Sequence, residues 1–163
     1  TSGGSSALPR TFRHVRELHE KTIRYRGHCE KIRALRALGL FSSETIRVGG
    51  GSVSPRQVLV RLLEQSLGSN EPDIVLVRAV LEGQTPRGRR RLIYEMRDTY
   101  DRRSGLTAMM RTTAFPTSIA VQLLARGEVP PGVHTLEQAV PAEEFLRELR
   151  RRGVRVRRRW SQT

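Results

Sequence analysis

The chain is poor in cysteine, aromatic side chains and long apolar runs, and each shortage excludes a class of protein. A single cysteine, Cys29, excludes an intramolecular disulfide framework and suits a reducing compartment. No apolar run approaches the ~20 residues that a membrane helix needs, so we expect neither a membrane span nor a membrane partner. Aromatic residues make up 5% of the sequence, which is little material for stacking nucleic acid bases.

Histidine is also scarce, and its positions do not predict a metal centre. His14, His19 and His134 lie at no ligand spacing from one another or from Cys29, so we expect no metal. Cys29 follows His28, yet adjacent side chains on a helix point in different directions. We therefore interpret Cys29 as a small buried or half-buried side chain rather than a catalytic nucleophile.

Acidic residues are too few to balance the basic ones, and the net charge is +14. Of the 30 basic residues only Lys21 and Lys31 are lysines, and the arginines gather at residues 87–91 and 147–159. This charge is compatible with nucleic acid or another polyanion as a partner. A genome that chooses arginine for every solvated cation gives the same skew, so we interpret the charge mainly as solvated surface and expect no nucleic acid partner. A basic, non-catalytic binding module remains the alternative.

Length and composition favour one soluble domain. With 163 residues, 37% of them hydrophobic and 28% charged, the chain is long enough to bury ~70% of its unfolded surface. It shows no signal peptide and starts with Thr1 rather than methionine, so we expect a cytoplasmic protein and a chain that is part of a longer one. We expect a single domain over residues 1–163, with a loop at residues 1–9 and a flexible tail at residues 157–163.

Apolar spacing predicts a mixture of helices and strands. The near-continuous apolar run Asp73–Gly83 predicts a strand covered on at least one face. The basic turn Gln84–Arg90 joins it to the alternating strand Arg91–Thr99, which makes an antiparallel hairpin. No complete βαβ unit is present, so we predict an α+β fold with a mixed, largely antiparallel sheet flanked by helices. The other predicted elements are helices at His28–Leu38, Pro55–Leu67, Ser118–Arg126 and Pro141–Arg152 and short strands at Thr45–Val48 and Val154–Val156.

Two segments rich in glycine or hydroxyl groups are candidates for anion binding. Gly49–Gly51 lacks both the GKS/T ending and the GxGxxG spacing of nucleotide-binding loops, so we interpret it as a flexible turn. Gly105–Pro116 is predicted to be a polar loop that opens the next helix, where orphan N–H groups and the Arg111 guanidinium suit an anion. Taken by itself, the pattern favours an ordinary helix cap, with the anion site as the alternative. We assign Asp98 and Asp101 to turn chemistry at the end of the hairpin.

Several segments resemble one family, in that family's order. They are TSGGSSALP at the start, KTIRYRGHCEKIRALRALGLF, the strand pair DIVLVRAVLEG…RRRLIYEMRDTYD, LTAMMRTTAFPTSIAVQLLARGEV and GVHTLEQAVPAEEFLRELRRRGV. Together they run from residue 1 to residue 156 or so, and they are similar to the C-terminal catalytic domain of the saccharopine dehydrogenase and lysine 6-dehydrogenase family. The resemblance implies a fold like the C-terminal domain of glyceraldehyde-3-phosphate dehydrogenase.

The resemblance also implies a function. Such enzymes are NAD- or NADP-dependent oxidoreductases of lysine metabolism that act on the C–N bond of an amino acid or an amino-acid-derived secondary amine. A Rossmann domain of the same protein holds the cofactor, while a domain like this one closes over the small amino-acid substrate and carries homodimer contacts. The sequence has no Rossmann fingerprint, so we expect this chain alone to be inactive. A non-catalytic interaction domain, from a member that lost its Rossmann half, is a further alternative.

The chemistry implied by the resemblance selects candidate site residues. Arg24 and Arg111 are candidates to bind substrate carboxylates, with an intramolecular ion pair as the alternative. His28 is the catalytic candidate, because its unperturbed pKa of about 6.5 suits proton transfer; a helix-capping role is the alternative. Candidate hydroxyl donors to the substrate are Tyr25, Thr112 and Thr113. Candidate cofactor contacts are Ser2, Gly3, Gly4, Phe115 and Pro116.

The chain departs from the common family pattern at two positions. Arg26 stands where the family commonly has proline, which loosens the turn and adds a cation. Ala114 stands where the family commonly has glycine, and a left-handed backbone would be costly there.

Overall fold

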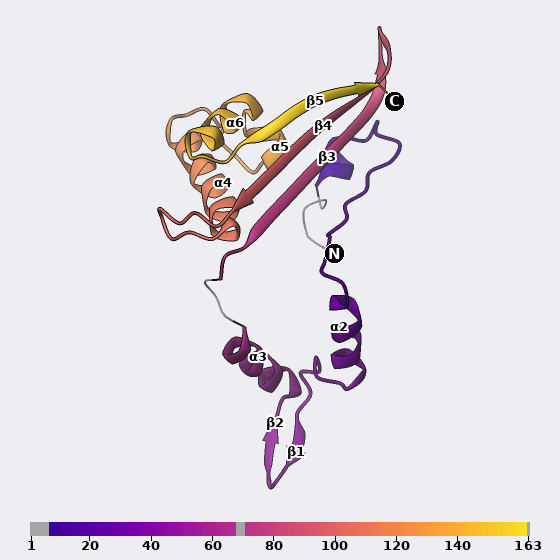
Figure 1. Ribbon diagram of the computed structural model, residues 1–163, viewed down its shortest axis with the longest axis vertical. Helices are drawn as coiled ribbons and strands as arrows, with labels where there is room; N and C mark the ends of the chain where they lie inside the picture. Colours follow the sequence, from indigo (N-terminus) through magenta and orange to yellow (C-terminus); the bar gives the residue numbers. More distant parts are fainter. Residues whose placement is uncertain (1–6, 68–70, 163) are drawn as a thin grey trace. The chain divides into compact units, whose positions relative to one another are not determined.

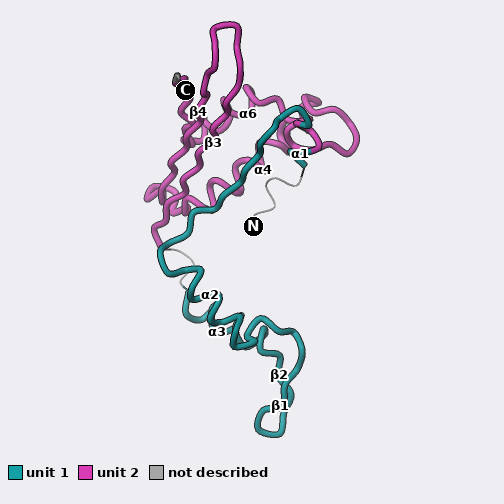
Figure 2. The backbone as a smooth tube through the Cα atoms, turned by 90° about the vertical axis from the view of Figure 1, so that its right-hand side faces the viewer, with its two compact units in different colours: residues 1–9, 13–69 teal, residues 10–12, 70–163 magenta. Residues whose placement is uncertain are grey.

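The computed structural model describes residues 7–67 and 71–162, with backbone only at Gln162. The predicted cofactor contacts Ser2, Gly3 and Gly4 lie outside these residues. The chain divides into two compact units, an N-terminal unit of residues 1–9 and 13–69 and a C-terminal unit of residues 10–12 and 70–163 (Figure 2). The expectation of one domain over residues 1–163 stays a prediction.

The N-terminal unit consists of two helices and a short hairpin (Figure 1). Its elements are helix α2 (His28–Ala37), strands β1 (Ile46–Val48) and β2 (Gly51–Val53) and helix α3 (Pro55–Ser66). Gly49 and Gly50 connect the two strands with φ values of 55° and 87°. Positive φ at both positions is what a type I′ hairpin turn requires, so the prediction of a turn here is confirmed.

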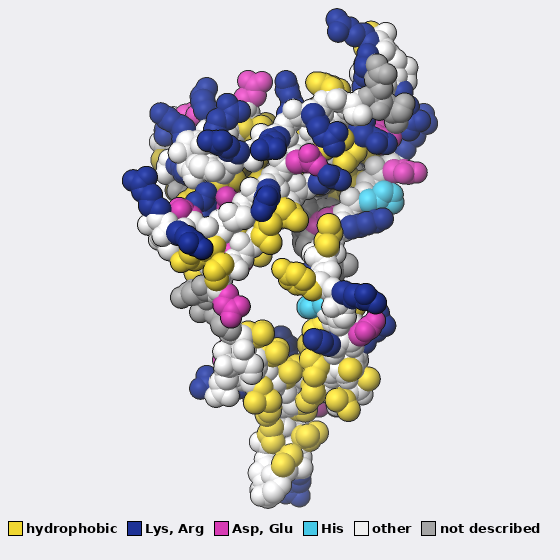
Figure 3. Space-filling view, in the orientation of Figure 1, with side chains coloured by type: hydrophobic (Ala, Val, Ile, Leu, Met, Phe, Trp, Pro, Cys, Tyr) yellow, Lys and Arg dark blue, Asp and Glu magenta, His cyan; other side chains and the backbone are white. Residues whose placement is uncertain are grey.

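The N-terminal unit buries little of its apolar surface. Among its described residues only Ser54 and Leu59 are buried, whereas Val48, Leu62 and Leu67 are each more than half exposed. Figure 3 shows hydrophobic side chains gathered on the surface of this unit, over the β1–β2 hairpin and the helices beside it. A surface of this kind needs a covering partner to become a core.

The C-terminal unit is an antiparallel sheet with helices packed against one end. Its elements are strands β3 (Ile74–Thr85), β4 (Gly88–Thr99) and β5 (Val156–Gln162) and helices α4 (Ala108–Ala125), α5 (Leu136–Ala139) and α6 (Ala142–Arg151). The sheet order is β3-β4-β5, and every strand pair in the described residues is antiparallel. The predicted α+β class is therefore confirmed, as is the hairpin, although its turn is tighter than predicted because pairing continues to Thr85 and Gly88.

Short elements occupy the described parts of the predicted loop at residues 1–9 and of the predicted tail at residues 157–163. Residues 157–162 form most of β5 rather than a flexible tail, because β4 offers them an open edge from Met96 to Arg90. Near the other end, Leu8–Thr11 forms the single helical turn α1 inside and just beyond the predicted loop of residues 1–9. None of the described helices combines the length and apolar character that crossing a membrane requires.

The core of the C-terminal unit lies where α4 and α6 meet the sheet. Ile119 and Leu123 from α4 pack with Leu149 from α6 and with Val154, and each is at most 6% exposed. Met96 of β4 and Phe115 of α4 pack against this cluster. Each fully buried aliphatic side chain contributes about 1.5–3 kcal/mol to folding, so this cluster anchors both helices on the β4 strand.

Strand β3 departs most clearly from expectation. Its apolar run predicts a covered strand, yet Leu76, Val77 and Leu81 are 63%, 51% and 53% exposed. Helix α4 contacts both β3 and β4, yet these three side chains stay exposed, and β3 is an edge strand among the described residues. A continuous apolar run indicates where burial is favourable, but it does not say which molecule supplies the cover.

Candidate functional site

Helix α4 begins earlier than predicted, and its N-terminus is fully capped. Thr107 is the N-cap residue, and its hydroxyl accepts a hydrogen bond from Met110 N at 3.0 Å. The Asp73 carboxylate, just before β3, accepts from Ala108 N at 2.5 Å and Met109 N at 2.8 Å. The structure shows the ordinary helix cap rather than an anion-binding loop at residues 105–116, because the N–H groups that would bind an anion already have acceptors.

Pro116 is the reason that the predicted start of helix α4, at Ser118, is wrong. The prediction started the helix after Pro116 because proline usually ends or begins a helix. In the structure Pro116 lies inside α4, which continues from Ala108 to Ala125. Asp73 and Thr107 fix the first turn from outside the helix, so the segment before the proline stays helical. Ala114, for which a left-handed backbone was a concern, is helical, and no described non-glycine residue has positive φ.

Arg111 lies at the centre of the junction between α4 and the sheet. Its Nε and Nη2 donate to the two carboxylate oxygens of Asp98 in β4, at 2.9 Å and 3.3 Å. Its Nη1 donates to Asp101 at 3.0 Å, and the guanidinium lies 5.7 Å from the centre of the Phe115 ring. Arg111 is only 9% exposed and Asp98 only 7%. The intramolecular ion pair that was the alternative for Arg111 is thus present, and it occupies all three donor nitrogens.

Asp101 and Asp98 have different roles. Asp101 accepts from the Ser104 hydroxyl at 2.7 Å and from Arg103 N at 3.1 Å, which confirms its assignment to turn chemistry. Those two hydrogen bonds, followed by the charge of Arg111, lower the pKa of its carboxyl below the ordinary value. The turn assignment of Asp98 is wrong, because Asp98 lies within β4 and points at Arg111.

The end of α6 meets the same junction. Gly153 has a φ of +81°, and a Cβ atom built on it would lie 3.4 Å from Arg111 Nη2. One turn earlier, the 5% exposed Glu148 accepts from Arg151 and Arg152, and Arg152 also donates to Gln122 of α4 at 2.9 Å. The hydrogen bonds from Arg152 and Arg151 lower the pKa of Glu148 to about 2. The hydrogen bond from Arg152 to Gln122 therefore joins the end of α6 to α4, in addition to the apolar contacts of the core.

The other predicted residues lie together on a turn at the start of α2. His28 N donates to Tyr25 O at 3.1 Å, and Gly27 between them has a φ of 81°. Arg24, Tyr25 and His28 are all exposed, Tyr25 by 87%. No ion pair joins Arg24 to a carboxylate among the described residues. Cys29 is exposed as well, so its predicted burial is wrong.

The predicted site residues thus form two groups, one in each unit. Arg24, Tyr25 and His28 belong to the N-terminal unit, and the group from Arg111 to Pro116 belongs to α4. Within α4 the Thr112 hydroxyl donates to Ala108 O at 2.8 Å, so it is used inside the helix. In the described ranges, no three His, Cys, Asp or Glu side chains gather as metal ligands.

Three residues of the α4 junction escaped the sequence interpretation: Asp73, Thr107 and Gly153. Thr107 had a local signal, because a threonine just after Gly105-Leu106 and before a long apolar run is a typical N-cap. Gly153 follows the helix predicted over residues 141–152, where glycine is a typical helix stop, but its closeness to Arg111 has no local signal. Asp73 caps a helix that starts 35 residues later, a distance at which spacing rules are silent.

Comparison with known families gives one match over most of the chain. The model of the saccharopine dehydrogenase C-terminal domain matches residues 5–154. That range includes both groups of predicted residues and the α4 junction. The predicted cofactor contacts Ser2, Gly3 and Gly4 lie outside it. The family is one of oxidoreductases, which supports a dehydrogenase-like function for the protein that carries this domain. The chain belongs to the saccharopine dehydrogenase C-terminal domain family.

Proposed function

We propose that the chain is the substrate-binding part of an NAD- or NADP-dependent oxidoreductase that acts on the C–N bond of an amino acid or an amino-acid-derived secondary amine. The family match over residues 5–154 carries this proposal. The substrate class is that of lysine or saccharopine, and the enzyme works in the cytoplasm.

The described residues form no Rossmann-type site for a dinucleotide. Their sheets contain antiparallel pairs only, and the N–H groups at the start of α4 are held by Asp73 and Thr107. A dinucleotide site uses a parallel βαβ unit and a free helix N-terminus. We therefore assign the cofactor to a Rossmann domain of the same protein, with Phe115 and Pro116 as the nearest contacts from this chain.

The turn at the start of α2 supplies the substrate contacts in this proposal. Arg24 binds the substrate carboxylate with two hydrogen bonds, which its planar guanidinium is shaped to do. Tyr25 donates a hydroxyl hydrogen bond, and His28 takes up the proton that the substrate amine releases. Their exposure and their closeness on one turn support these roles. Arg111, whose donors are occupied, instead positions α4, and Thr112 and Thr113 lie on that helix.

Helix α4 has a second apolar face, and we assign it to the Rossmann domain. Met110, Val121 and Leu124 are 42%, 60% and 56% exposed, and their spacing places them on one side of the helix. This side is opposite the residues that enter the core. An exposed apolar stripe of this kind marks a surface that another domain covers. The exposed strand β3 is our candidate for contact between two copies in a homodimer.

Paired substitutions in the intact, cofactor-binding protein test the substrate turn. We expect Arg24→Gln to raise the KM for the amino-acid substrate about tenfold or more, because a charge-assisted contact is lost. Arg26→Gln removes the same charge two residues away and leaves KM within about twofold. His28→Ala lowers kcat, because the proton acceptor for the substrate amine is lost.

Steady-state formation of the reduced nicotinamide, with lysine and saccharopine as substrates, measures these effects. Equal KM changes in the Arg24 and Arg26 variants would show that Arg24 does not bind the substrate. Absence of turnover with every amine of this class would contradict the proposed reaction itself.

A further inference from the structure

The far end of the β3–β4 hairpin carries a hollow that the proposed enzyme function does not use. Figure 2 shows the hairpin projecting beyond the rest of its unit. The hollow has a volume of about 500 Å³, within the ~300–1,000 Å³ range of small-ligand sites. It is lined by Thr85, Pro86, Arg87, Arg90 and Trp160.

Trp160 gives the hollow an open aromatic surface. It is the single tryptophan of the chain, and it is 59% exposed. In β5 it pairs with Leu92 of β4, so Arg90, two residues from Leu92, lies on the same face of the sheet. The one guanidinium–ring contact in the described residues is that of Arg111 with Phe115, which leaves the indole face available for another flat group.

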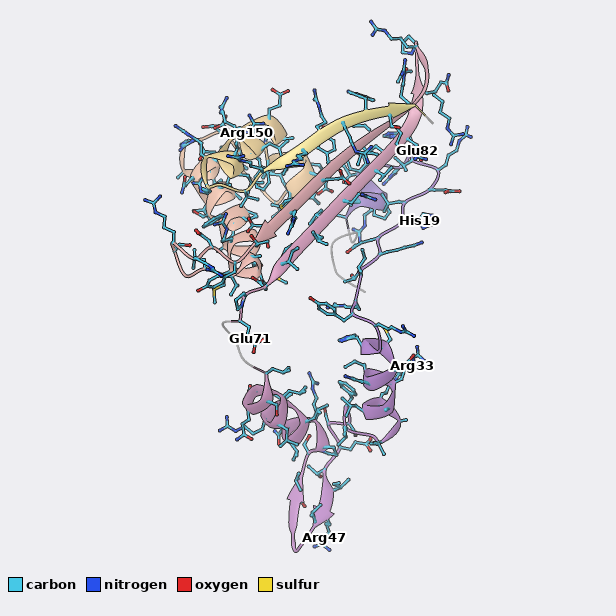
Figure 4. All side chains as sticks on the ribbon, viewed as in Figure 1. His19, Arg33, Arg47, Glu71, Glu82 and Arg150 are labelled. Carbon is cyan, nitrogen blue, oxygen red and sulfur yellow. The ribbon has the colours of Figure 1, made fainter. Side chains whose placement is uncertain are left out.

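Four arginines on the opposite face of the sheet bind carboxylates. Figure 4 shows one of these carboxylates, Glu82, near the end of β5. Glu82 binds Arg89 and Arg91, and Glu95 binds Arg78 and Arg159. The hydrogen bond from Arg91 lowers the pKa of Glu82, and the one from Arg78 lowers the pKa of Glu95. These carboxylates therefore stay charged and hold their arginines.

The arginines on the Trp160 face have no such partners. Arg90 and Arg158 alternate with the paired residues along β4 and β5, and Arg87 lies in the hairpin turn. No ion pair joins any of these three to a carboxylate in residues 7–67 and 71–161, where side chains are described. Figure 3 shows Lys and Arg side chains at this end of the unit. Unpaired guanidiniums beside an exposed indole combine attraction for an anion with a surface for stacking.

We propose that this hollow binds a nucleoside phosphate. The base stacks on the Trp160 indole, and the phosphate lies between the guanidiniums of Arg87 and Arg90. Every base offers a flat face for stacking on the indole, and phosphate is an anion that arginine can bind with two hydrogen bonds. Trp160 lies beyond residue 154, outside the family match, so the family does not account for it. The same chemistry is offered by a free nucleotide and by one residue of a single-stranded nucleic acid.

Fluorescence of the single tryptophan tests the site directly. We expect AMP or a short single-stranded oligodeoxythymidylate to quench Trp160 with saturation, because stacking places a base on the indole. Arg90→Gln weakens binding about tenfold, as the loss of a phosphate contact predicts. Arg89→Gln removes the same charge from the opposite face, where Glu82 holds it, and changes affinity less than about twofold.

A second readout does not depend on the tryptophan signal. Displacement of a dye-labelled oligodeoxythymidylate compares Trp160→Leu with Trp160→Phe. We expect leucine to weaken binding about tenfold and phenylalanine to retain most of it, since only phenylalanine can stack. Circular dichroism of each variant verifies that β5 is still folded.

The outcomes separate the two sources of the ligand. Saturable quenching by AMP supports a free-nucleotide site, and quenching by the oligonucleotide alone supports a single-stranded nucleic acid. Absence of quenching by both ligands overturns the proposal. So does equal weakening by Arg89→Gln and Arg90→Gln, or equal quenching by polyglutamate, because either result means that net charge alone attracts the ligand.

Discussion

The α4 junction and the turn at the start of α2 place the same side chain in opposite surroundings. Arg111 is 9% exposed and its donors are taken by Asp98 and Asp101. Arg24 is exposed and meets no carboxylate among the described residues. By residue type alone, both arginines are candidates to bind a substrate carboxylate. The comparison teaches that the surrounding acids decide whether an arginine supports the fold or remains available for a ligand.

The physical reason is the cost of removing water from a charge. A guanidinium buried beside β4 loses its hydration, and only well-placed carboxylates restore that free energy. Arg24 keeps its hydration and has no such requirement. We therefore expect substitutions at the α4 junction to affect stability, and substitutions in the α2 turn to affect binding.

The largest expected effect comes from Arg111→Ala. It leaves Asp98 buried without its partner, so the free energy of unfolding falls by about 3–5 kcal/mol. Arg24→Ala, the matched control, changes it by less than about 0.5 kcal/mol. Urea denaturation followed by circular dichroism measures both. Similar losses in the two variants would remove the basis of the comparison.

Two glycines with the same φ extend the comparison between the α4 junction and the α2 turn. Gly153 and Gly27 both have a φ of +81°, but only Gly153 has a heavy atom within 4 Å of an added Cβ, Arg111 Nη2. We expect Gly27→Ala to cost about 1–2 kcal/mol from backbone strain alone. Gly153→Ala brings its methyl group into ordinary van der Waals contact with Arg111 Nη2, so we expect the same backbone cost as at Gly27 and no displacement of Arg111.

A double-mutant cycle tests whether Arg111 adds to the cost at Gly153. We expect Gly153→Ala to cost the same, within about 0.5 kcal/mol, in the wild-type and Arg111→Ala backgrounds, since the contact with Nη2 is not a clash. Thermal and urea unfolding of the single and double variants provide the values. A cost that falls when Arg111 is removed would show that the contact is repulsive.

The smallest expected effect is a pH dependence at Glu148. Its pKa is about 2 in the folded chain against an ordinary value of 4.5, so its ion pairs stabilise the fold fully above pH 4.5. That contribution is lost as the pH falls from about 4.5 to about 2. We expect Glu148→Gln to flatten the fall in Tm over this window. Glu143→Gln, on the exposed side of the same helix, should keep the wild-type slope.

Local patterns predicted the elements better than their surroundings. The alternation in β4 and the Gly153 stop after α6 are short-range signals, and both elements formed as predicted. The start of α4 was misplaced because Pro116 is a strong local signal, whereas Asp73 acts from 35 residues away. The family resemblance was confirmed because it rests on several segments in order. Burial of β3 could not be predicted, since an apolar run does not identify its cover.

The late position of β5 in the chain has a consequence for synthesis on the ribosome. Residues 74–99 emerge and can close into the β3–β4 hairpin more than fifty residues before β5 is made. A two-stranded hairpin is marginally stable alone, and until β5 arrives the second edge of β4 is open to other chains. Translation that stops before Val156 therefore leaves an aggregation-prone ribbon with two free edges. Strand β5 therefore protects the open edge of β4 in the nascent chain, in addition to completing the finished sheet.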